Sequence, residues 1–299
     1  MIQIDINDFI EAQLDVWDDA RARYHQLGKV ERKPFESGDF KGFFQFNPSR
    51  IVSTGAKIDK NTISQRPCFL CKDNRPECQF SMPLVEGWDF LVNPFPIFPV
   101  HFTISNINHV PQVHFPPESL LFADRFLELA VFFNGAKAGA SAPDHAHLQA
   151  VLKSELPLLR FVEENHPASH NGILSSHDFD LKPPFLIYSA VIPPTSEGEN
   201  ILRRMSLLTG WDITTGNPDL GLRNIVVWKD SVAGLMRMVV IPRKAHRPAC
   251  YNAEGDSKLL VSPGTIDMCG VVIVPRQEDF ERIDSADISR IYSEVAFPS

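Results

Sequence analysis

The chain has 299 residues, 43% of them hydrophobic and 22% charged, which is long enough for one large domain or two ordinary ones. A net charge of −8 and the lack of any basic run exclude the usual nucleic-acid-binding composition, and no apolar run approaches the ~20 residues of a membrane span. The N-terminal residues lack signal-peptide features, and five cysteines fit a reducing cytoplasm better than a disulfide framework, so we expect a cytoplasmic protein.

The N-terminal segment predicts an accessory helix and a connector. Asn7 is the candidate N-cap, apolar residues follow at helical spacing, and Gly28 would end the helix. The stretch from Lys29 to Asp39 is polar and contains Pro and Gly, as connectors do. We expect residues 1–40 to pack on the rest of the chain and to carry no chemistry.

A pair of cysteines follows two short strands that are predicted between Phe43 and Thr54 around an Asn-Pro turn. Cys68 and Cys71 form a Cys-x-x-Cys motif, which supplies half of a tetrahedral metal site. An inert or redox-active thiol pair is the alternative. The absence of an adjacent βαβ pattern argues against a thioredoxin-like motif.

Further along, strands are predicted at 88–96 and 98–104, and a helix is predicted to open at Pro116. Apolar residues extend the expected face of that helix to Phe133. A loop of small residues from Asn134 to Ser141 comes next, and its freed backbone N–H groups suit a diphosphate.

The most informative segment follows this loop. His145, His147 and Gln149 share one parity, and small apolar residues occupy the other. On a strand, two imidazoles and one amide would therefore lie on a single face. A strand-borne imidazole suits a nucleophile, and an amide can donate to a phosphoryl oxygen without adding charge. The alternative is a half-buried strand that happens to contain two histidines.

The run His145-Ala146-His147-Leu148-Gln149 resembles the signature of the histidine-triad (HIT) superfamily, in the nucleotidyltransferase branch whose signature ends in Gln. Galactose-1-phosphate uridylyltransferases, GDP-hexose phosphorylases and dinucleoside-polyphosphate phosphorylases belong to this branch. The resemblance implies an α+β fold of two tandem HIT-like halves with antiparallel sheets. Residues 41–160 would form the catalytic half and residues 161–299 a degenerate second half.

The resemblance also implies roles for single residues. His147 would attack the α-phosphorus of a nucleotide, while Gln149 and Ser141 would stabilise the phosphoryl oxygens. The segment from Asn134 to Ser141 is similar to the uridylyltransferase phosphate loop, so Asn134 and Gly139 are expected to bind the nucleotide. The spacing from Ser141 to the His strand is one residue longer than the family pattern.

Two further elements of the site are implied by the same resemblance. Asn93 and Phe95 are similar to a segment that the family places against the nucleoside; a proline-rich turn with a core Phe is the alternative. One structural zinc is expected. Its ligands would be Cys68, Cys71, His109 and His145. His101, His114 and Cys78 are the competing ligands.

The second half of the sequence contains a weak internal repeat. Residues 152–184 read as a loop, and a strand and a helix are expected at 185–192 and 200–208. The strand pair at 224–230 and 235–242, with its basic loop, repeats the order seen at 89–111. Residues 262–276 resemble the C-terminal part of GDP-hexose and dinucleoside-tetraphosphate phosphorylases.

The function that these resemblances imply is nucleotidyl transfer from a nucleoside diphosphate sugar through a covalent nucleotidyl-histidine. Phosphate is the favoured acceptor, with nucleoside diphosphate and sugar 1-phosphate as products, and Arg50, Lys57 and Lys137 are candidate phosphate-binding cations. A hexose-1-phosphate uridylyltransferase, a dinucleoside-polyphosphate phosphorylase and a HIT hydrolase are the alternatives. A nucleotide-binding protein without catalysis would have no need of His147. The sequence leaves open a homodimer.

Overall fold

The computed structural model describes residues 5–55, 60–170, 172–210, 221–230 and 233–299. Its largest element is a nine-stranded sheet in the order β3-β4-β5-β7-β6-β10-β11-β9-β8, with all neighbouring strands antiparallel. In that order the strands are β3 (Met82–Val85), β4 (Trp88–Val92), β5 (His101–Asn106), β7 (His147–Leu152), β6 (Leu129–Asn134), β10 (Arg223–Lys229), β11 (Met236–Pro242), β9 (Tyr188–Ile192) and β8 (Gly172–Ser175).

The central strands are apolar on both parities because both faces of this sheet are covered. In β10, Ile225 and Val227 belong to one hydrophobic core, whereas Val226 and Trp228 belong to another on the opposite face. Successive side chains of a strand point to opposite faces, so two cores separated by one sheet follow directly from the alternation.

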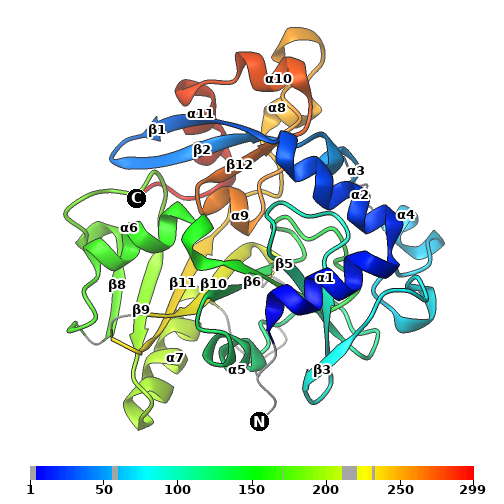
Figure 1. The fold of residues 1–299 in the computed structure, drawn as a ribbon. Coiled ribbons are helices and arrows are strands. Elements are labelled where there is room, and N and C mark those ends of the chain that lie inside the picture. Colours follow the sequence, from blue (N-terminus) through cyan, green and yellow to red (C-terminus); the bar gives the residue numbers. More distant parts are fainter. Residues whose placement is uncertain (1–4, 56–59, 171, 211–220, 231–232) are drawn as a thin grey trace.

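Three helices cover one face of the large sheet. They are α1 (Ile6–Val16), α5 (Glu118–Arg125) and α7 (Ser196–Thr209). Figure 1 shows α1, α5 and α7 on the side of the sheet away from the small sheet. Their buried residues, such as Ile10, Phe122 and Met205, belong to the same hydrophobic core as Leu148 and Ala150 of β7. The expectation that small apolar residues lie behind the histidine strand is therefore confirmed.

A three-stranded sheet covers the other face, together with α6 (Pro157–Asn165) and α9 (Thr265–Met268) (Figure 1). It contains β1 (Glu31–Ser37), β2 (Phe40–Phe46) and β12 (Val271–Val274). The parallel pairing of β12 with β2 joins segments from the two ends of the chain. His147 and Gln149 share the parity of Val151, which belongs to this second core, so the histidine face lies under the small sheet.

The remaining helices are mostly short. They are α2 (Asp18–Gln26), α3 (Ile51–Thr54), α4 (Lys60–Gln65), α8 (Ala249–Asn252), α10 (Gln277–Arg282), α11 (Ser285–Val295) and 3₁₀ turns, of which η2 (Pro48–Arg50) contributes to the site described below. None of the described helices is both long and apolar enough to cross a membrane.

Several N-terminal predictions were wrong. The first helix is capped by Asp5, whose carboxylate accepts from Asn7 N–H, and it breaks at Trp17 before α2 begins. The expected connector contains β1, because it pairs along its whole length with β2. The segment after the Asn-Pro turn is helical, through η2 and α3, rather than a second strand.

Two central predictions were also wrong. Leu129 to Asn134 forms the strand β6 and not the end of a helix, since a strand buried on both faces carries apolar residues at every position, as a wide helix face does. The expected loop at 152–184 contains α6 and β8.

The two predicted halves share one sheet. β6 of the first half pairs with β10 of the second from Ala130–Trp228 to Asn134–Asn224. The α+β class is confirmed, and the large sheet is antiparallel as predicted, whereas the small sheet includes the parallel β2–β12 pair. The tandem duplication and the boundaries at 41–160 and 161–299 stay predictions.

Candidate active site

The candidate site begins where β7 loses one of its two neighbours. Pairing between β6 and β7 runs from Leu129–Leu152 to Phe132–Gln149, whereas pairing with β5 continues to His147. The side chain of Gln112 fills the resulting gap. Its Oε1 accepts from the His147 N–H at 2.7 Å, and its Nε2 donates to the carbonyls of His147 and Asn134 at 2.8 and 3.0 Å.

The imidazole of His147 is held in one tautomer. Its Nδ1–H donates to the His145 carbonyl at 2.8 Å, so its lone pair is on Nε2, which forms no hydrogen bond with any described residue. Burial lowers the pKa of His147 to about 4, and the ring is therefore neutral at pH 7. A nucleophilic imidazole needs its other nitrogen protonated and held, and the His145 carbonyl does this for His147.

A cluster of two thiols and two imidazoles lies at the start of β7. Its members are Cys68, Cys71, His109 and His145, and their ligand atoms all lie within 4.8 Å of one another. The Cys68 Sγ–His145 Nδ1 and Cys71 Sγ–His109 Nδ1 distances are both 3.3 Å, and the Cys71 Sγ–His145 Nδ1 distance is 3.6 Å. Tetrahedral zinc requires sulfur–nitrogen edges of about 3.6 Å from its usual bond lengths.

The cluster therefore fits zinc in donor chemistry and in size. His145 Nε2–H is directed away from the sulfurs and donates to the Asn106 carbonyl at 2.8 Å, which leaves Nδ1 for a metal. Burial tends to raise the pKa of Cys68, but hydrogen bonds from the His145 ring and from backbone N–H groups lower it to about 6 and favour the thiolate. A bound metal would replace the proton on His145 Nδ1 in this contact. The competitors His101, His114 and Cys78 lie outside this cluster.

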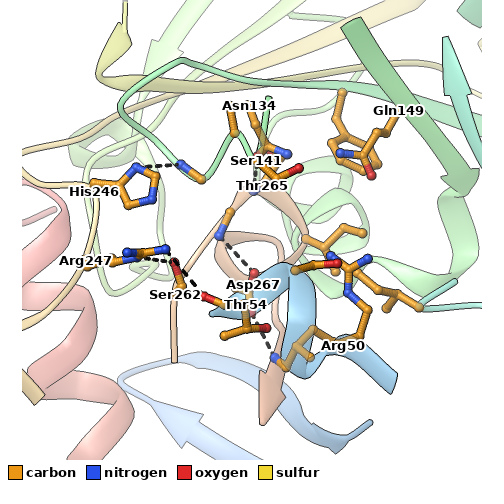
Figure 2. Close-up of a pocket in the computed structure, with 18 residues that line it drawn as sticks. Arg50, Thr54, Asn134, Ser141, Gln149, His246, Arg247, Ser262, Thr265 and Asp267 are labelled. Carbon is orange, nitrogen blue, oxygen red and sulfur yellow. Dashed lines mark hydrogen bonds between the residues drawn. The ribbon is translucent and has the colours of Figure 1, made fainter. Parts of the chain in front are cut away.

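A cleft of about 660 Å³, including its open mouth, adjoins Gln149. Four segments distant in sequence line it: residues 50–54, the loop at 139–141, residues 246–247, and residues 262–267. Figure 2 shows Gln149 and Arg50 on one side of this cleft and His246 and Arg247 on the other. His147 is not among the lining residues. It lies one alternation along β7 from Gln149, at roughly 7 Å.

Four predicted site residues line this cleft. They are Ser141, Gln149, Asn134 and Gly139. Asn134 also closes the fold: its Oδ1 accepts from the Thr265 N–H at 2.7 Å and the Thr265 hydroxyl at 2.8 Å. The Gly139 N–H donates to His246 Nδ1 at 3.4 Å. Both ends of the 134–139 segment, which was expected to bind phosphate, are therefore hydrogen-bonded to the C-terminal part of the chain.

Two arginines line the cleft. The Arg50 Nη1 donates to the Phe95 carbonyl at 2.7 Å, while its Nε is buried without a hydrogen-bond partner among the described residues. Arg247 stacks on Tyr251, and its Nε donates to the Ser262 hydroxyl at 3.0 Å. Of the other predicted cations, Lys137 is exposed and does not line the cleft, and Lys57 lies outside the described residues.

Asn93 and Phe95 lie outside the cleft lining. The Asn93 side chain accepts from the Phe95 N–H at 2.8 Å and donates to the Thr103 hydroxyl at 2.9 Å, which holds the turn before β5. The Phe95 ring packs under the Arg23 guanidinium at 4.4 Å. Their predicted contact with the nucleoside stays a prediction.

Sequence reasoning missed several residues that build the site. Gln112, Thr265 and Asp267 belong to no motif, and only the fold brings them to β7 and the cleft. Arg247 stood in the basic loop of the internal repeat, and that position was the one available signal.

The fold is similar to that of solved structures of one yeast protein. The crystal structure of yeast Ap4A phosphorylase Apa2 aligns over 95% of this chain and 98% of its own, with a TM-score of 0.56 and 16% identity. The complex of yeast Apa2 with AMP aligns over 96% and 97%, with a TM-score of 0.58 and 18% identity. The complex with Ap4A aligns over 95% and 98%, with a TM-score of 0.58 and 16% identity.

A family model described as "Domain of unknown function (DUF4922)" matches residues 9–152. The matched segment contains the Cys/His cluster, His147 and Gln149, but not Arg247 or Thr265. No curated protein matches the sequence significantly.

Proposed function

We propose that this chain is a nucleotidyltransferase whose nucleophile is Nε2 of His147. The observation that supports this most is the hydrogen bond from Nδ1–H to the His145 carbonyl, because it leaves Nε2 as the basic atom of a fixed ring. Covalent catalysis at phosphorus needs such an oriented neutral imidazole. The adjacent cleft, with Gln149 and two arginines, supplies space and donors for phosphates.

The reaction would proceed by two displacements. First, Nε2 attacks the α-phosphorus of the nucleotide in line, a P–N bond forms, and the bond from phosphorus to the bridging oxygen breaks. The departing phosphate monoester keeps that oxygen and its electron pair. An acceptor phosphate oxygen then attacks the same phosphorus, and the P–N electrons return to Nε2. Two moderate barriers replace one large barrier.

The chain's own groups would stabilise the charge on the phosphoryl oxygens. The Gln149 amide and the Ser141 hydroxyl lie at the cleft and can donate without adding charge. Arg50 adds a positive charge: burial lowers its pKa, but only to about 10, so the guanidinium is charged at pH 7. Zinc bound by the Cys/His cluster would hold the 68–71 segment against the start of β7 as a structural ion.

The proposed donor is a nucleoside diphosphate sugar, and the proposed acceptor is inorganic phosphate. Bare phosphate needs only a few donors and positive charge, which Arg50 and Arg247 offer. A sugar-phosphate acceptor would need polar groups for several hydroxyls. The products would be a nucleoside diphosphate and a sugar 1-phosphate. The alternative that the sequence leaves open is a uridylyltransferase, in which a hexose 1-phosphate accepts the nucleotidyl group.

A second candidate substrate is a dinucleoside polyphosphate. The alignment with yeast Ap4A phosphorylase over nearly the whole of both chains favours it. The same two steps apply: the leaving group would be a nucleoside triphosphate, and phosphate would release a nucleoside diphosphate from His147.

Product analysis tests the proposal. The wild-type protein is incubated with GDP-, UDP- or ADP-hexoses, or with Ap4A, each with and without phosphate, and the nucleotides are separated by ion-exchange chromatography. Phosphate-dependent release of nucleoside diphosphate with sugar 1-phosphate supports the first donor, and ADP with ATP supports the second.

The kinetic mechanism gives a further criterion. The scheme requires ping-pong kinetics and a nucleotidyl-protein that accumulates when phosphate is omitted. Discharge of that intermediate to hexose 1-phosphate, but not to phosphate, would replace the phosphorylase by the transferase. Hydrolysis unaffected by phosphate would replace both by a HIT hydrolase.

A further inference from the structure

A third histidine lies on the same face of the sheet as His147 and Gln149. His101 is the first residue of β5, and neither the proposed chemistry nor the Cys/His cluster uses it. Its side chain is fully buried. A buried imidazole is costly unless both ring nitrogens have partners, so its hydrogen bonds indicate what it does.

The partner of Nδ1 determines the tautomer. The backbone N–H of Ile97 points at His101 Nδ1 across 3.1 Å. A backbone amide nitrogen can only donate, so Nδ1 must be the acceptor and carry the lone pair. The ring proton of a neutral imidazole is then on Nε2. A protonated ring would place two hydrogens between Ile97 and Nδ1.

The partner of Nε2 is the Gln149 side chain. The His101 Nε2–Gln149 Oε1 distance is 2.8 Å. Because Nε2 carries the proton, the atom of the amide that faces it must be the carbonyl oxygen, and the NH₂ group is turned the other way. Gln149 lines the cleft, and its NH₂ group has no hydrogen-bond partner among the described residues. The Asn93 Nδ2, 3.5 Å from the same ring nitrogen, donates instead to the Thr103 hydroxyl.

The surroundings keep His101 neutral. Burial, followed by the nearby positive charge of Arg50, lowers the pKa of His101 to about 3. The same tautomer is therefore present at neutral pH. The hydrogen bonds run in one direction, from the Ile97 amide through the imidazole to the Gln149 carbonyl.

We infer that His101 is a positioning residue that orients the Gln149 amide with its N–H groups toward the phosphoryl oxygens of the bound nucleotide. The inference rests on the proposed function for the identity of that ligand. The orientation itself follows from donors and acceptors alone. Without His101, the amide oxygen and nitrogen could exchange places, and the oxygen would then face a phosphoryl oxygen and repel it.

The kinetic test compares two variants at one position. His101→Phe keeps a ring of similar size without either nitrogen, whereas His101→Gln keeps an N–H donor near the position of Nε2. We expect His101→Phe to lower kcat about tenfold, the order of one lost buried hydrogen bond, with little change in KM. His101→Gln should recover most of the loss. An equal kcat loss in both variants, or a change confined to KM, would overturn the inference.

A double-mutant cycle separates positioning from general damage. If His101 acts through Gln149, then His101→Phe should have no further effect on kcat in the Gln149→Ala background. A tenfold loss in both backgrounds would show that His101 acts by another route and would overturn the inference. Circular dichroism and thermal unfolding of each variant report whether it is folded.

A spectroscopic measurement tests the chain of hydrogen bonds from Ile97 through His101 to Gln149 without relying on activity. Imidazole ¹⁵N shifts, assigned by comparison with His101→Phe, should show a neutral Nε2–H ring at neutral pH. The Gln149 side-chain amide signal should move in His101→Phe. A charged ring or the Nδ1–H tautomer would overturn the inference whatever the activity. If the wild-type protein shows the expected tautomer but no nucleotidyl transfer, the orientation of Gln149 by His101 is supported and only the proposed function is contradicted.

Discussion

Three imidazoles on or next to one sheet face differ in chemistry because each has a different backbone partner. His145 donates through Nε2 to the Asn106 carbonyl, His147 donates through Nδ1 to the His145 carbonyl, and His101 accepts the Ile97 N–H. The remaining ring nitrogen is free to bind a metal in His145, would be the proposed nucleophile in His147, and carries a proton in His101. Residue type alone therefore does not assign these roles, since the backbone partner selects the tautomer.

The nucleophile gives the first prediction. His147→Ala should abolish turnover and nucleotidyl labelling of the protein, because no other described basic group occupies that position on β7. Gln149→Ala should still be labelled, with kcat lower by ~10²–10³, since it loses a transition-state donor. Quench-flow labelling with a radioactive nucleotide substrate measures both. Near-wild-type turnover in His147→Ala would end the covalent hypothesis.

A second prediction concerns the acceptor. Arg50→Met removes a guanidinium that lines the cleft, and we expect the KM for phosphate to rise about tenfold through loss of a charge-assisted hydrogen bond. Lys137→Met is the matched control, because it makes the same charge change on an exposed side chain outside the cleft. Initial rates at varied phosphate concentration give the KM for phosphate in each of the two variants. Equal effects would mean that overall charge, rather than this arginine, attracts phosphate.

At the scale of elements, the site exists because β6 and β7 separate. β6 ends at Asn134 and β7 begins at His147, and Gln112 holds the two strands where their own pairing has stopped. The alternation from His145 to Ala150 predicted correctly which residues of β7 share a face, since a period of two is a local property. The same alternation is absent from β6, because both of its faces are buried and every position before Asn134 is apolar, so the sequence predicted a helix there.

Crowding in the loop between these strands gives a third prediction. A Cβ on Gly139, whose φ is +96°, would lie 2.5 Å from the Gly264 Cα. Gly139→Ala should therefore cost roughly 1–2 kcal/mol for the backbone and a further 1–3 kcal/mol for the clash. It should also lower kcat/KM, because the loop at the cleft must move away from Gly264. Urea unfolding and kinetics measure the two effects.

Gly87→Ala provides the control for this prediction. Gly87 has a similar φ of +82°, and no atom lies within 4 Å of the added Cβ. It should show only the backbone cost of roughly 1–2 kcal/mol, with unchanged kinetics. If Gly139→Ala were no worse than Gly87→Ala, the loop would not be packed against the C-terminal segment as described.

At the scale of the whole molecule, the two ends of the chain complete the cleft. Arg50 comes from the segment after β2, and Thr265 and Asp267 precede β12, which pairs with β2. The Asp267 carboxylate accepts from the Gly264 and Ile273 N–H groups, which fixes the turn that meets Asn134. The β12–β2 pairing and the contact between Thr265 and Asn134 each span more than 100 residues, so no motif or periodicity in the sequence predicts them. The Cys/His cluster could be predicted because the family resemblance assigns each of its four residues individually.

The Cys/His cluster connects three distant segments, so metal content should control the stability of the whole protein. We expect about one zinc per chain in protein purified without chelators, and Cys71→Ser should lose it and lower the Tm by roughly 10 °C or more. Cys78→Ser is the control, since Cys78 is half-buried and lies outside the cluster. It should keep both zinc and Tm.

Elemental analysis and calorimetry measure the two quantities. Because His145 is a cluster member and precedes β7 directly, release of zinc should also displace the strand that bears His147 and reduce turnover. Less than ~0.2 zinc per chain in the wild type would contradict the prediction, since tetrahedral sites of this kind bind tightly. Equal Tm values for Cys71→Ser and Cys78→Ser would contradict it as well, because the cluster would then hold nothing that the fold requires.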